Sequence, residues 1–235
     1  IASASENINI EKRVAITPEI AKKYISLGFE VKIQKNYAYH LGFDDNLYKE
    51  LGVKVEQDVS GVYENANIIV QLNLPSAENL SQLKENQCII GVLDPYTNKE
   101  NISELIKKKI NSFSLELLPR ITRAQSMDIL SSQANLAGYK AVVDSFALFK
   151  KAIPMMMTAA GTISAAKVLI VGAGVAGLQA IATAKRMGAI VFATDVRMAS
   201  KEQVESLGGK FLTVEGSENL ETEGGYAKEA SDDFK

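Results

Sequence analysis

The fold of this chain is decided by the stretch Val168-Leu-Ile-Val-Gly172-Ala-Gly174-Val-Ala-Gly177-Leu-Gln-Ala-Ile181, in which an aliphatic run breaks into closely spaced glycines and resumes rich in alanine. This pattern predicts a strand, a tight turn and a helix. The first glycine lets the chain turn, the second lets the backbone approach a pyrophosphate, and the third lets helix and strand pack closely. We therefore predict a dinucleotide-binding turn, with the pyrophosphate on the first helical amides.

The residues that follow support this interpretation. A helix predicted from Val175, through Ala176, to Met187 stops at Gly188, and a β-like run then ends at Asp195. Asp195 lies about 20 residues beyond the last glycine, where a ribose-binding carboxylate is expected. Its charge would repel a 2′-phosphate and so favours NAD over NADP. The alternative is an ordinary strand-helix turn with incidental glycines.

The two residues after Asp195 also belong to the predicted cofactor site. Val196 and Arg197 follow it directly, and we assign both to the nucleotide site. The guanidinium of Arg197 makes a comparison of NADH with NADPH a real test of the preference, because arginine is a common partner of a 2′-phosphate.

The composition is that of a globular protein. The 235 residues are 46% hydrophobic and 23% charged, with a net charge of −2, which gives no general attraction to nucleic acid. Since His40 and Cys88 are the single histidine and cysteine, we expect no structural zinc site. No window approaches the roughly 20 apolar residues of a membrane span.

Short helix and strand patterns alternate through the first half of the chain. Residues 1–12 are small and polar and predict a frayed start, followed by a short strand, Arg13–Thr17. Thr17 and Pro18 then suit the cap and first position of a helix, which ends at Gly28. Repeated short elements of this kind predict a parallel-rich α/β sheet in residues 1–127.

A polar stretch separates this half from the glycine turn. If a helix starts near Thr122, with Gln125 completing a capping box, then Gln125, Asp128 and Ser131 recur every three residues along one side. The stripe predicts a functional surface. The alternative is that Arg120 and Asp128 form a structural ion pair.

The same helix is expected to continue to Pro154, and residues 128–153 then predict an interdomain helix. Its expected apolar face consists of Leu136, Tyr139, Val143, Phe146 and Phe149.

Several blocks resemble a known family. Pro119-Arg-Ile-Thr-Arg-Ala-Gln-Ser-Met-Asp128, Leu130-Ser-Ser-Gln-Ala-Asn-Leu-Ala-Gly-Tyr139 and Gly174-Val-Ala-Gly-Leu-Gln-Ala-Ile-Ala182 are similar to the NAD(H)-binding component of proton-translocating NAD(P) transhydrogenase. Lys201-Glu-Gln-Val-Glu-Ser-Leu-Gly-Gly209 extends the match. The wider family includes alanine dehydrogenase, which shares the Arg13-Val-Ala-Ile-Thr-Pro18 opening.

The resemblance implies roles for individual residues. Arg120, Asp128 and Ser131 would approach the nicotinamide, and Gln125 would reach the nucleotide of a partner domain. Asp195 would bind the adenosine ribose, and a loop carrying Tyr226 would close over the nucleotide. Direct hydride transfer needs two nicotinamide rings in near-attack geometry, so positioning and exclusion of water matter more than acid or base catalysis.

The resemblance also implies cofactors, partners and location. NAD(H) would bind this chain, and NADP(H) would bind a partner domain tied to membrane-spanning, proton-translocating domains. A homodimer is expected, peripheral to a membrane on the bacterial cytoplasmic face or the mitochondrial matrix side.

Departures from the family pattern leave alternatives. Alanine dehydrogenases carry a lysine and a histidine where alignment gives Gln71 and Val92 here, so reductive amination has no obvious proton donor. A non-catalytic NAD-binding fragment is the third hypothesis. We predict an α/β fold of two Rossmann-like parallel-sheet domains joined by a long helix, with the second domain, residues 154–235, cut short after its first half.

Overall fold

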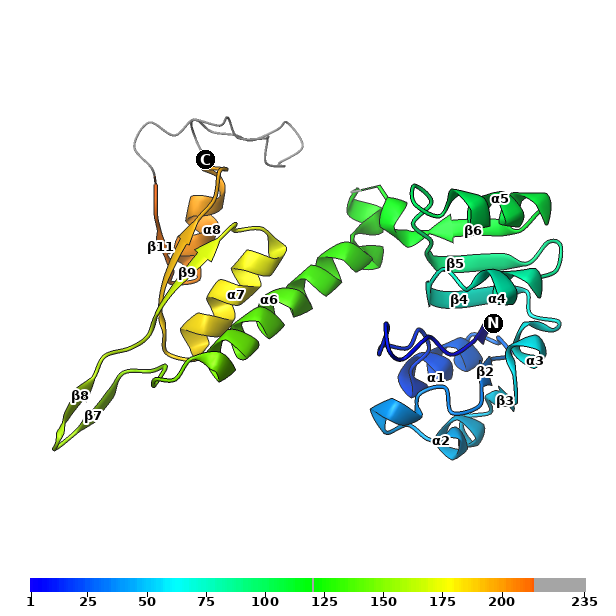
Figure 1. The fold of residues 1–235 in the computed structure, drawn as a ribbon, viewed down its shortest axis with the longest axis horizontal. Coiled ribbons are helices and arrows are strands. Elements are labelled where there is room, and N and C mark those ends of the chain that lie inside the picture. The colour runs from blue at the N-terminus through cyan, green and yellow to red at the C-terminus, as the bar shows by residue number, and fades with distance from the viewer. Residues whose placement is uncertain (120, 214–235) are drawn as a thin grey trace. The chain divides into compact units, whose positions relative to one another are not determined.

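The structure is a computed structural model that describes residues 1–119 and 121–213. These residues divide into two compact units, Ile1–Asp128 and a second that begins at Ile129. Figure 1 labels their helices and strands. Two predicted site residues, Arg120 and Tyr226, lie outside the described residues. The finer division into an N-terminal domain, an interdomain helix and a half domain stays a prediction.

The first unit is built on a six-stranded parallel sheet, which confirms the predicted fold class. The strand order is β3-β2-β1-β4-β5-β6, so the order reverses between β1 and β4. Ligands of such sheets bind outside the carboxyl ends of the strands at this reversal. The strands are β1 (Ala2–Ser3), β2 (Lys32–Gln34), β3 (Lys54–Glu56), β4 (Ile68–Asn73), β5 (Cys88–Val92) and β6 (Asn111–Ser114).

Helices connect these strands and cover the sheet. Two clusters of buried side chains form the core, one including the first two helices and the other the next three. The α-helices are α1 (Pro18–Ser26), α2 (Asp45–Glu50), α3 (Val59–Tyr63), α4 (Ala77–Ser81) and α5 (Lys99–Lys107), and short 3-10 helices cover Tyr39–Leu41, Leu115–Leu117 and Thr122–Met127.

The predicted frayed start is wrong. Ala2 and Ser3 form β1, which pairs with β2 on one side and β4 on the other, and both side chains are buried. The Ser3 hydroxyl lies 2.7 Å from the Tyr37 hydroxyl and donates to Gln71 Oε1 at 3.0 Å. Small residues suit this crowded central position, and pairing with two neighbours, rather than local sequence, makes the segment a strand.

The start of α1 agrees with the prediction, but the segment before it does not. The Thr17 side chain accepts a hydrogen bond from the Ile20 amide, and Pro18 opens the helix. The predicted strand Arg13–Thr17 is not a strand. The amides of Ala15 and Ile16 instead donate to the Tyr37 hydroxyl, at 3.0 and 3.1 Å, so a buried side chain satisfies this backbone.

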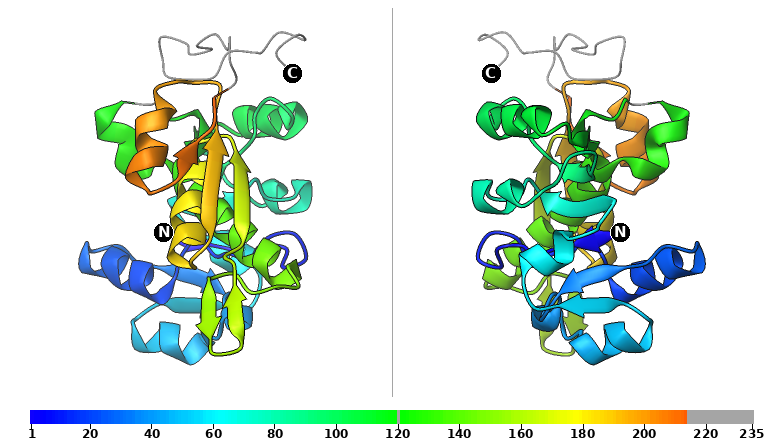
Figure 2. Two further views of the ribbon diagram at one scale, coloured as in Figure 1. Left: turned by 90° about the vertical axis from the view of Figure 1, so that its left-hand side faces the viewer. Right: turned by 90° about the vertical axis from the view of Figure 1, so that its right-hand side faces the viewer.

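The second unit contains a three-stranded parallel sheet in the order β11-β10-β9 and an antiparallel hairpin of β7 and β8. Within this unit the hairpin extends away from the parallel sheet, while α6 and α7 lie side by side (Figures 1 and 2). The elements are α6 (Ile129–Leu148), β7 (Met156–Thr158), β8 (Gly161–Ile163), β9 (Lys167–Val171), α7 (Val175–Arg186), β10 (Ile190–Thr194), α8 (Ser200–Ser206) and β11 (Lys210–Phe211).

The two helices α6 and α7 meet through a glycine. A Cβ added at Gly138 would lie 2.0 Å from the Ala176 carbonyl oxygen, so any side chain here would push the helices apart. The predicted apolar face of α6 is only partly right: Phe146 packs against the core of the second unit, but Leu136 and Tyr139 are about half exposed, and the buried residues are Gly138 and Val142. Apolar residues occur all around α6, so periodicity did not single out the contact face.

The predicted beginning and end of this helix are also corrected. Residues Thr122–Met127 form a 3-10 helix capped by Ile121 without a side-chain hydrogen bond, and α6 starts only at Ile129. Gln125, Asp128 and Ser131 therefore do not share one side of a single α-helix. The helix ends at Leu148 rather than near Pro154.

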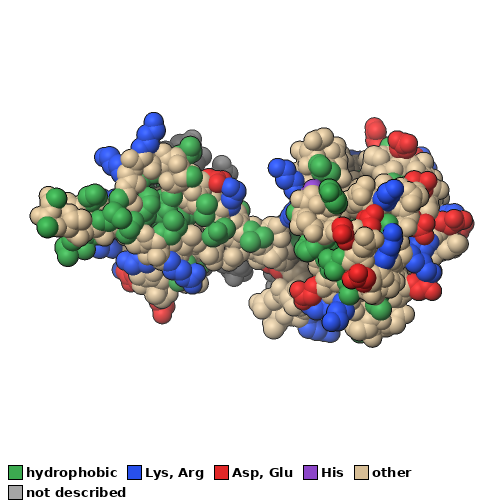
Figure 3. Space-filling view, turned by 90° about the horizontal axis from the view of Figure 1, so that it is seen from below, with side chains coloured by type: hydrophobic (Ala, Val, Ile, Leu, Met, Phe, Trp, Pro, Cys, Tyr) green, Lys and Arg blue, Asp and Glu red, His purple; other side chains and the backbone are tan. Residues whose placement is uncertain are grey.

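Hydrophobic side chains gather on the surface of the second unit (Figure 3). On β9, Val168 and Ile170 pack into the core, while Leu169 and Val171 on the opposite face are 61% and 78% exposed. The hairpin residues Met157 and Ile163 are exposed as well. Within the described ranges, no helix combines the length and apolar character needed to cross a membrane.

Candidate dinucleotide-binding site

The glycine turn has the predicted geometry. β9 ends at Val171, Gly172 adopts a positive φ of 94°, and α7 begins at Val175. A Cβ at Gly177 would lie 1.8 Å from the Gly172 carbonyl oxygen, so only glycine allows α7 to pack this closely on the turn. The first glycine therefore turns the chain and the third sets the helix-strand distance.

The middle glycine leaves space beside the turn. A Cβ added at Gly174 would meet Arg197 Nη2 at 3.9 Å and no other atom outside the neighbouring residues within 4 Å. Gly174 is also the N-cap of α7 and offers no side-chain acceptor to the first amides, which belong to Val175 and Ala176. This cradle fits a pyrophosphate, since both the open backbone and the helix dipole favour an anion there.

Asp195 follows β10 and its carboxylate reaches back to the turn. The Gly172 amide donates to the Thr194 carbonyl at 2.8 Å, and the Ala173 amide donates to Asp195 Oδ2 at 2.6 Å. The turn and the end of β10 are thus tied by both backbone and side chain. This contact brings the predicted ribose-binding residue and the predicted pyrophosphate turn together.

Arg197 binds the same carboxylate. Its amide and Nε donate to Asp195 Oδ1, both at 2.8 Å, and Nη2 donates to Oδ2 at 2.9 Å. Burial raises the pKa of the Asp195 carboxyl, but the hydrogen bonds from Arg197 and from the Ala173 amide outweigh it and hold that pKa below its ordinary value. Asp195 is therefore ionised at neutral pH. Val196 between them is half-buried.

The upstream predicted residues belong to different regions of the chain. Gln125, in the 3-10 helix, is exposed, and Asp128 is half-buried; both belong to the first unit. Ser131 lies half-buried in the first turn of α6, in the second unit. The predicted approach of these residues to a nicotinamide ring stays a prediction.

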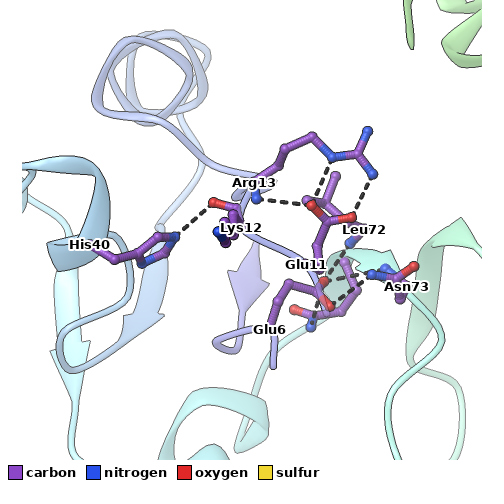
Figure 4. A network of polar contacts seen from close by, with 8 residues as sticks. Glu6, Glu11, Lys12, Arg13, His40, Leu72 and Asn73 are labelled. Carbon is purple, nitrogen blue, oxygen red and sulfur yellow. Dashed lines mark hydrogen bonds and ion pairs between the residues drawn. The ribbon is translucent and has the colours of Figure 1, made fainter. Parts of the chain in front are cut away.

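Sequence reasoning missed a polar network in the first unit (Figure 4). Glu6 Oε1 accepts hydrogen bonds from the amides of Leu72 and Asn73, at 2.8 and 3.3 Å, and Oε2 accepts from the Asn73 side chain at 3.2 Å. Glu11 accepts from Arg13 Nε and Nη2, at 2.8 and 2.5 Å. The Arg13 hydrogen bonds lower the pKa of Glu11 to about 2 against the opposing effect of burial.

This network borders a cavity of about 580 Å³ at the reversal of strand order. The lining includes Glu6, which follows β1, and Gln71 and Asn73, which lie in the second half of β4. Gln71 Oε1 accepts from the Ser3 hydroxyl and from the Ala4 amide at 2.8 Å. The sequence contains only a weak signal for this network, namely Glu6 and Glu11 followed by Arg13. These residues lie in or beside the segment predicted to be a frayed terminus, so no site was assigned to them.

Metal binding finds no support in the geometry of the described residues. Among residues 1–119 and 121–213, no group of three His, Cys, Asp or Glu side chains could hold a metal ion.

Comparison with known families identifies both units. The alanine dehydrogenase/PNT N-terminal domain matches residues 4–137, and the C-terminal domain of the same family matches residues 141–231. The chain belongs to the alanine dehydrogenase/PNT family. The similar proteins include NAD(P) transhydrogenase subunits, as the sequence resemblance predicted, and alanine dehydrogenases.

Similar family members carry transhydrogenase names. The chain is 48% identical to a protein of Rickettsia prowazekii (strain Madrid E) named as the first portion of NAD(P) transhydrogenase subunit alpha, with 100% of this chain and 62% of that protein covered. It is 47% identical to the protein of that name from Rhodospirillum rubrum, covering 100% and 63%. The chain thus spans about three-fifths of the length of these relatives.

A solved family structure confirms the fold. The crystal structure of transhydrogenase from Sinorhizobium meliloti superimposes with a TM-score of 0.84 at 48% identity, covering 90% of this chain and 64% of that one. The α/β architecture of two parallel sheets is therefore shared with a transhydrogenase.

Proposed function

We propose that this chain is the NAD(H)-binding component of an NAD(P) transhydrogenase, passing hydride from NADH to NADP⁺ held by a partner domain. One observation carries the proposal: the open cradle at Gly174 lies beside the Asp195 carboxylate, which is hydrogen-bonded to the turn. This arrangement suits the pyrophosphate and ribose of a dinucleotide. The type of reaction in this proposal comes from the names of the similar relatives, which are NAD(P) transhydrogenase subunits.

Each predicted residue has a task in this proposal. The turn Gly172–Gly177 and the amides of Val175 and Ala176 bind the pyrophosphate, and Asp195 and Val196 bind the adenosine end. Arg197, whose Nη2 lies near Gly174, completes the nucleotide site between them. A bound nicotinamide supplies the hydride. The chain contributes position: Arg120, Asp128 and Ser131 orient the ring, Gln125 contacts the partner's nucleotide, and Tyr226 helps to exclude water.

The partners follow from the same proposal. An NADP(H)-binding domain must bring its own nicotinamide close to this one, and membrane-spanning domains would couple the transfer to proton translocation. The chain would act as a homodimer at the membrane surface.

The alternative, an alanine dehydrogenase-like enzyme, is disfavoured by the cavity in the first unit. A small keto acid needs cationic or amide donors for its carboxylate, but here Glu6 occupies the amides of Leu72 and Asn73, and Glu11 pairs with Arg13. Gln71 carries no ionisable group, and its oxygen is committed to β1 and the residue after it. The carboxylates of Glu6 and Glu11 therefore already occupy donors that the carboxylate of a keto acid would need.

The test is hydride transfer in a reconstituted pair. The full chain is mixed with an isolated NADP-binding transhydrogenase component, NADH and the thionicotinamide analogue of NADP⁺, whose reduction gives a distinct absorbance. The proposal predicts reduction that needs both proteins. NADH oxidation with pyruvate and ammonia by this chain alone would contradict it, and NADH binding without transfer in the pair would favour a non-catalytic NAD-binding fragment.

A further inference from the structure

The carboxylate of Asp195 is saturated with hydrogen-bond donors. An ionised carboxylate offers about four acceptor positions on its two oxygens. Here Oδ1 receives the Arg197 amide and Nε, and Oδ2 receives the Ala173 amide and Arg197 Nη2, at 2.6 to 2.9 Å. The side chain is only 5% exposed. A ribose diol therefore cannot add its two hydroxyls to this carboxylate unless two donors leave.

Two of these four donors belong to a side chain and two to the backbone. The amides of Ala173 and Arg197 are backbone groups, and the first belongs to the turn that Gly172 ties to β10. The Arg197 guanidinium is on a flexible side chain that is 21% exposed. Two hydroxyl donors replacing Nε and Nη2 would keep the number of hydrogen bonds on Asp195 constant.

The Arg197 guanidinium also lies near a second position that it could occupy, beside Gly174. Its Nη2 lies 3.9 Å from the position a Cβ would take on Gly174, at the open side of the pyrophosphate turn. A displaced guanidinium remains beside the space where two phosphates would sit, and a planar guanidinium matches phosphate oxygens well.

We propose that Arg197 holds the place of the ribose: its guanidinium occupies Asp195 in the nucleotide-free chain, leaves when a vicinal diol binds, and then faces the pyrophosphate beside Gly174. This inference rests on the proposed NAD(H)-binding function. Its consequence is that the diol contributes little to affinity in the wild-type chain, since each new hydrogen bond replaces a charge-assisted one.

The experiment measures what the diol contributes. Dissociation constants of ADP and 2′,3′-dideoxy-ADP are determined by calorimetry for the full chain. The dissociation constant of the dideoxy compound divided by that of ADP measures how much the diol contributes to affinity. In Arg197→Met the guanidinium is gone while a side chain of similar length remains, so the ratio should rise about tenfold over wild type. Adenosine, which has no phosphate, should bind more tightly to this variant.

Matched variants separate this effect from a general change in charge or fold. Arg186→Met removes an arginine at the other end of α7 and should leave the ratio unchanged. Asp195→Asn should not raise the ratio, because it replaces one carboxylate oxygen with an NH2 donor and leaves the diol a single neutral acceptor. Arg197→Lys, which keeps the charge but not the fork of donors, should give an intermediate ratio and serves if the methionine variant does not fold.

An unchanged or lower ratio in a folded Arg197→Met or Arg197→Lys variant overturns the inference while NADH binding still supports the proposed function. Absence of both ADP and NADH binding to the wild-type chain overturns the proposed function, and this inference with it.

Discussion

Gly177→Ala is predicted to destabilise the second unit, because its new Cβ has no room. The Cβ would lie 1.8 Å from the Gly172 carbonyl oxygen and 2.9 Å from its carbonyl carbon, and both atoms belong to backbone that cannot rotate away. Overpacking of this kind costs about 3 kcal/mol at the upper end of its usual range. The better helix propensity of alanine offsets about 1 kcal/mol, which leaves a net loss of about 2 kcal/mol.

Gly174→Ala in the same turn is the matched control. Its φ is −77°, and its Cβ would meet only Arg197 Nη2 at 3.9 Å, so the free energy of unfolding should fall by less than about 1 kcal/mol. The same Cβ would stand in the space left for the pyrophosphate and should weaken NADH binding by about tenfold or more, equivalent to about 1.4 kcal/mol.

The assay pairs urea unfolding, followed by circular dichroism, with calorimetric titration of NADH. The expected pattern is a crossover, in which the alanine at 177 lowers stability and the alanine at 174 lowers affinity. Equal stability of the two variants would refute the packing argument. Undiminished NADH affinity of a folded Gly174→Ala would refute the assignment of the turn to the pyrophosphate.

Two further predictions concern the first unit. Tyr37→Phe removes the acceptor of the Ala15 and Ile16 amides and should cost about 2 to 3 kcal/mol in urea unfolding, whereas a loss below about 0.5 kcal/mol would show that these amides find other partners. The folded pKa of Glu11, about 2, lies below the ordinary value of 4.5, so its ion pair with Arg13 should stabilise the chain fully above pH 4.5 and lose that contribution as the pH falls towards 2. The difference in unfolding free energy between wild type and Glu11→Gln, measured across this range, should shrink in the same way, and a difference that is constant from pH 6 to 2 would contradict the assignment.

The features of the site that the sequence predicted are those set by local constraints. Gly172, Gly174 and Gly177 each meet a steric condition that the spacing alone expresses, and the strand ending before Asp195 follows at the expected distance. The end of α7 before Gly188 was predicted for the same reason, since Gly188 adopts a positive φ of 88° there.

The features that the sequence did not reveal depend on contacts between distant residues. Ala2 and Ser3 form a strand because β2 and β4 flank them, and neither residue has a strong β propensity of its own. Glu6 serves as an acceptor for the end of β4, 66 and 67 positions later in the chain, which no local pattern encodes. The contact face of α6 depends on Gly138, whose contribution is the absence of a side chain.

The most direct test of the central claim is a calorimetric comparison of NADH and NADPH binding to the full chain. Asp195 is ionised and hydrogen-bonded to the turn, so NADH is predicted to bind at least about tenfold more tightly than NADPH, and Asp195→Asn should reduce that preference. Equal affinities of the wild-type chain for the two nucleotides, or no binding of NADH, would contradict the account.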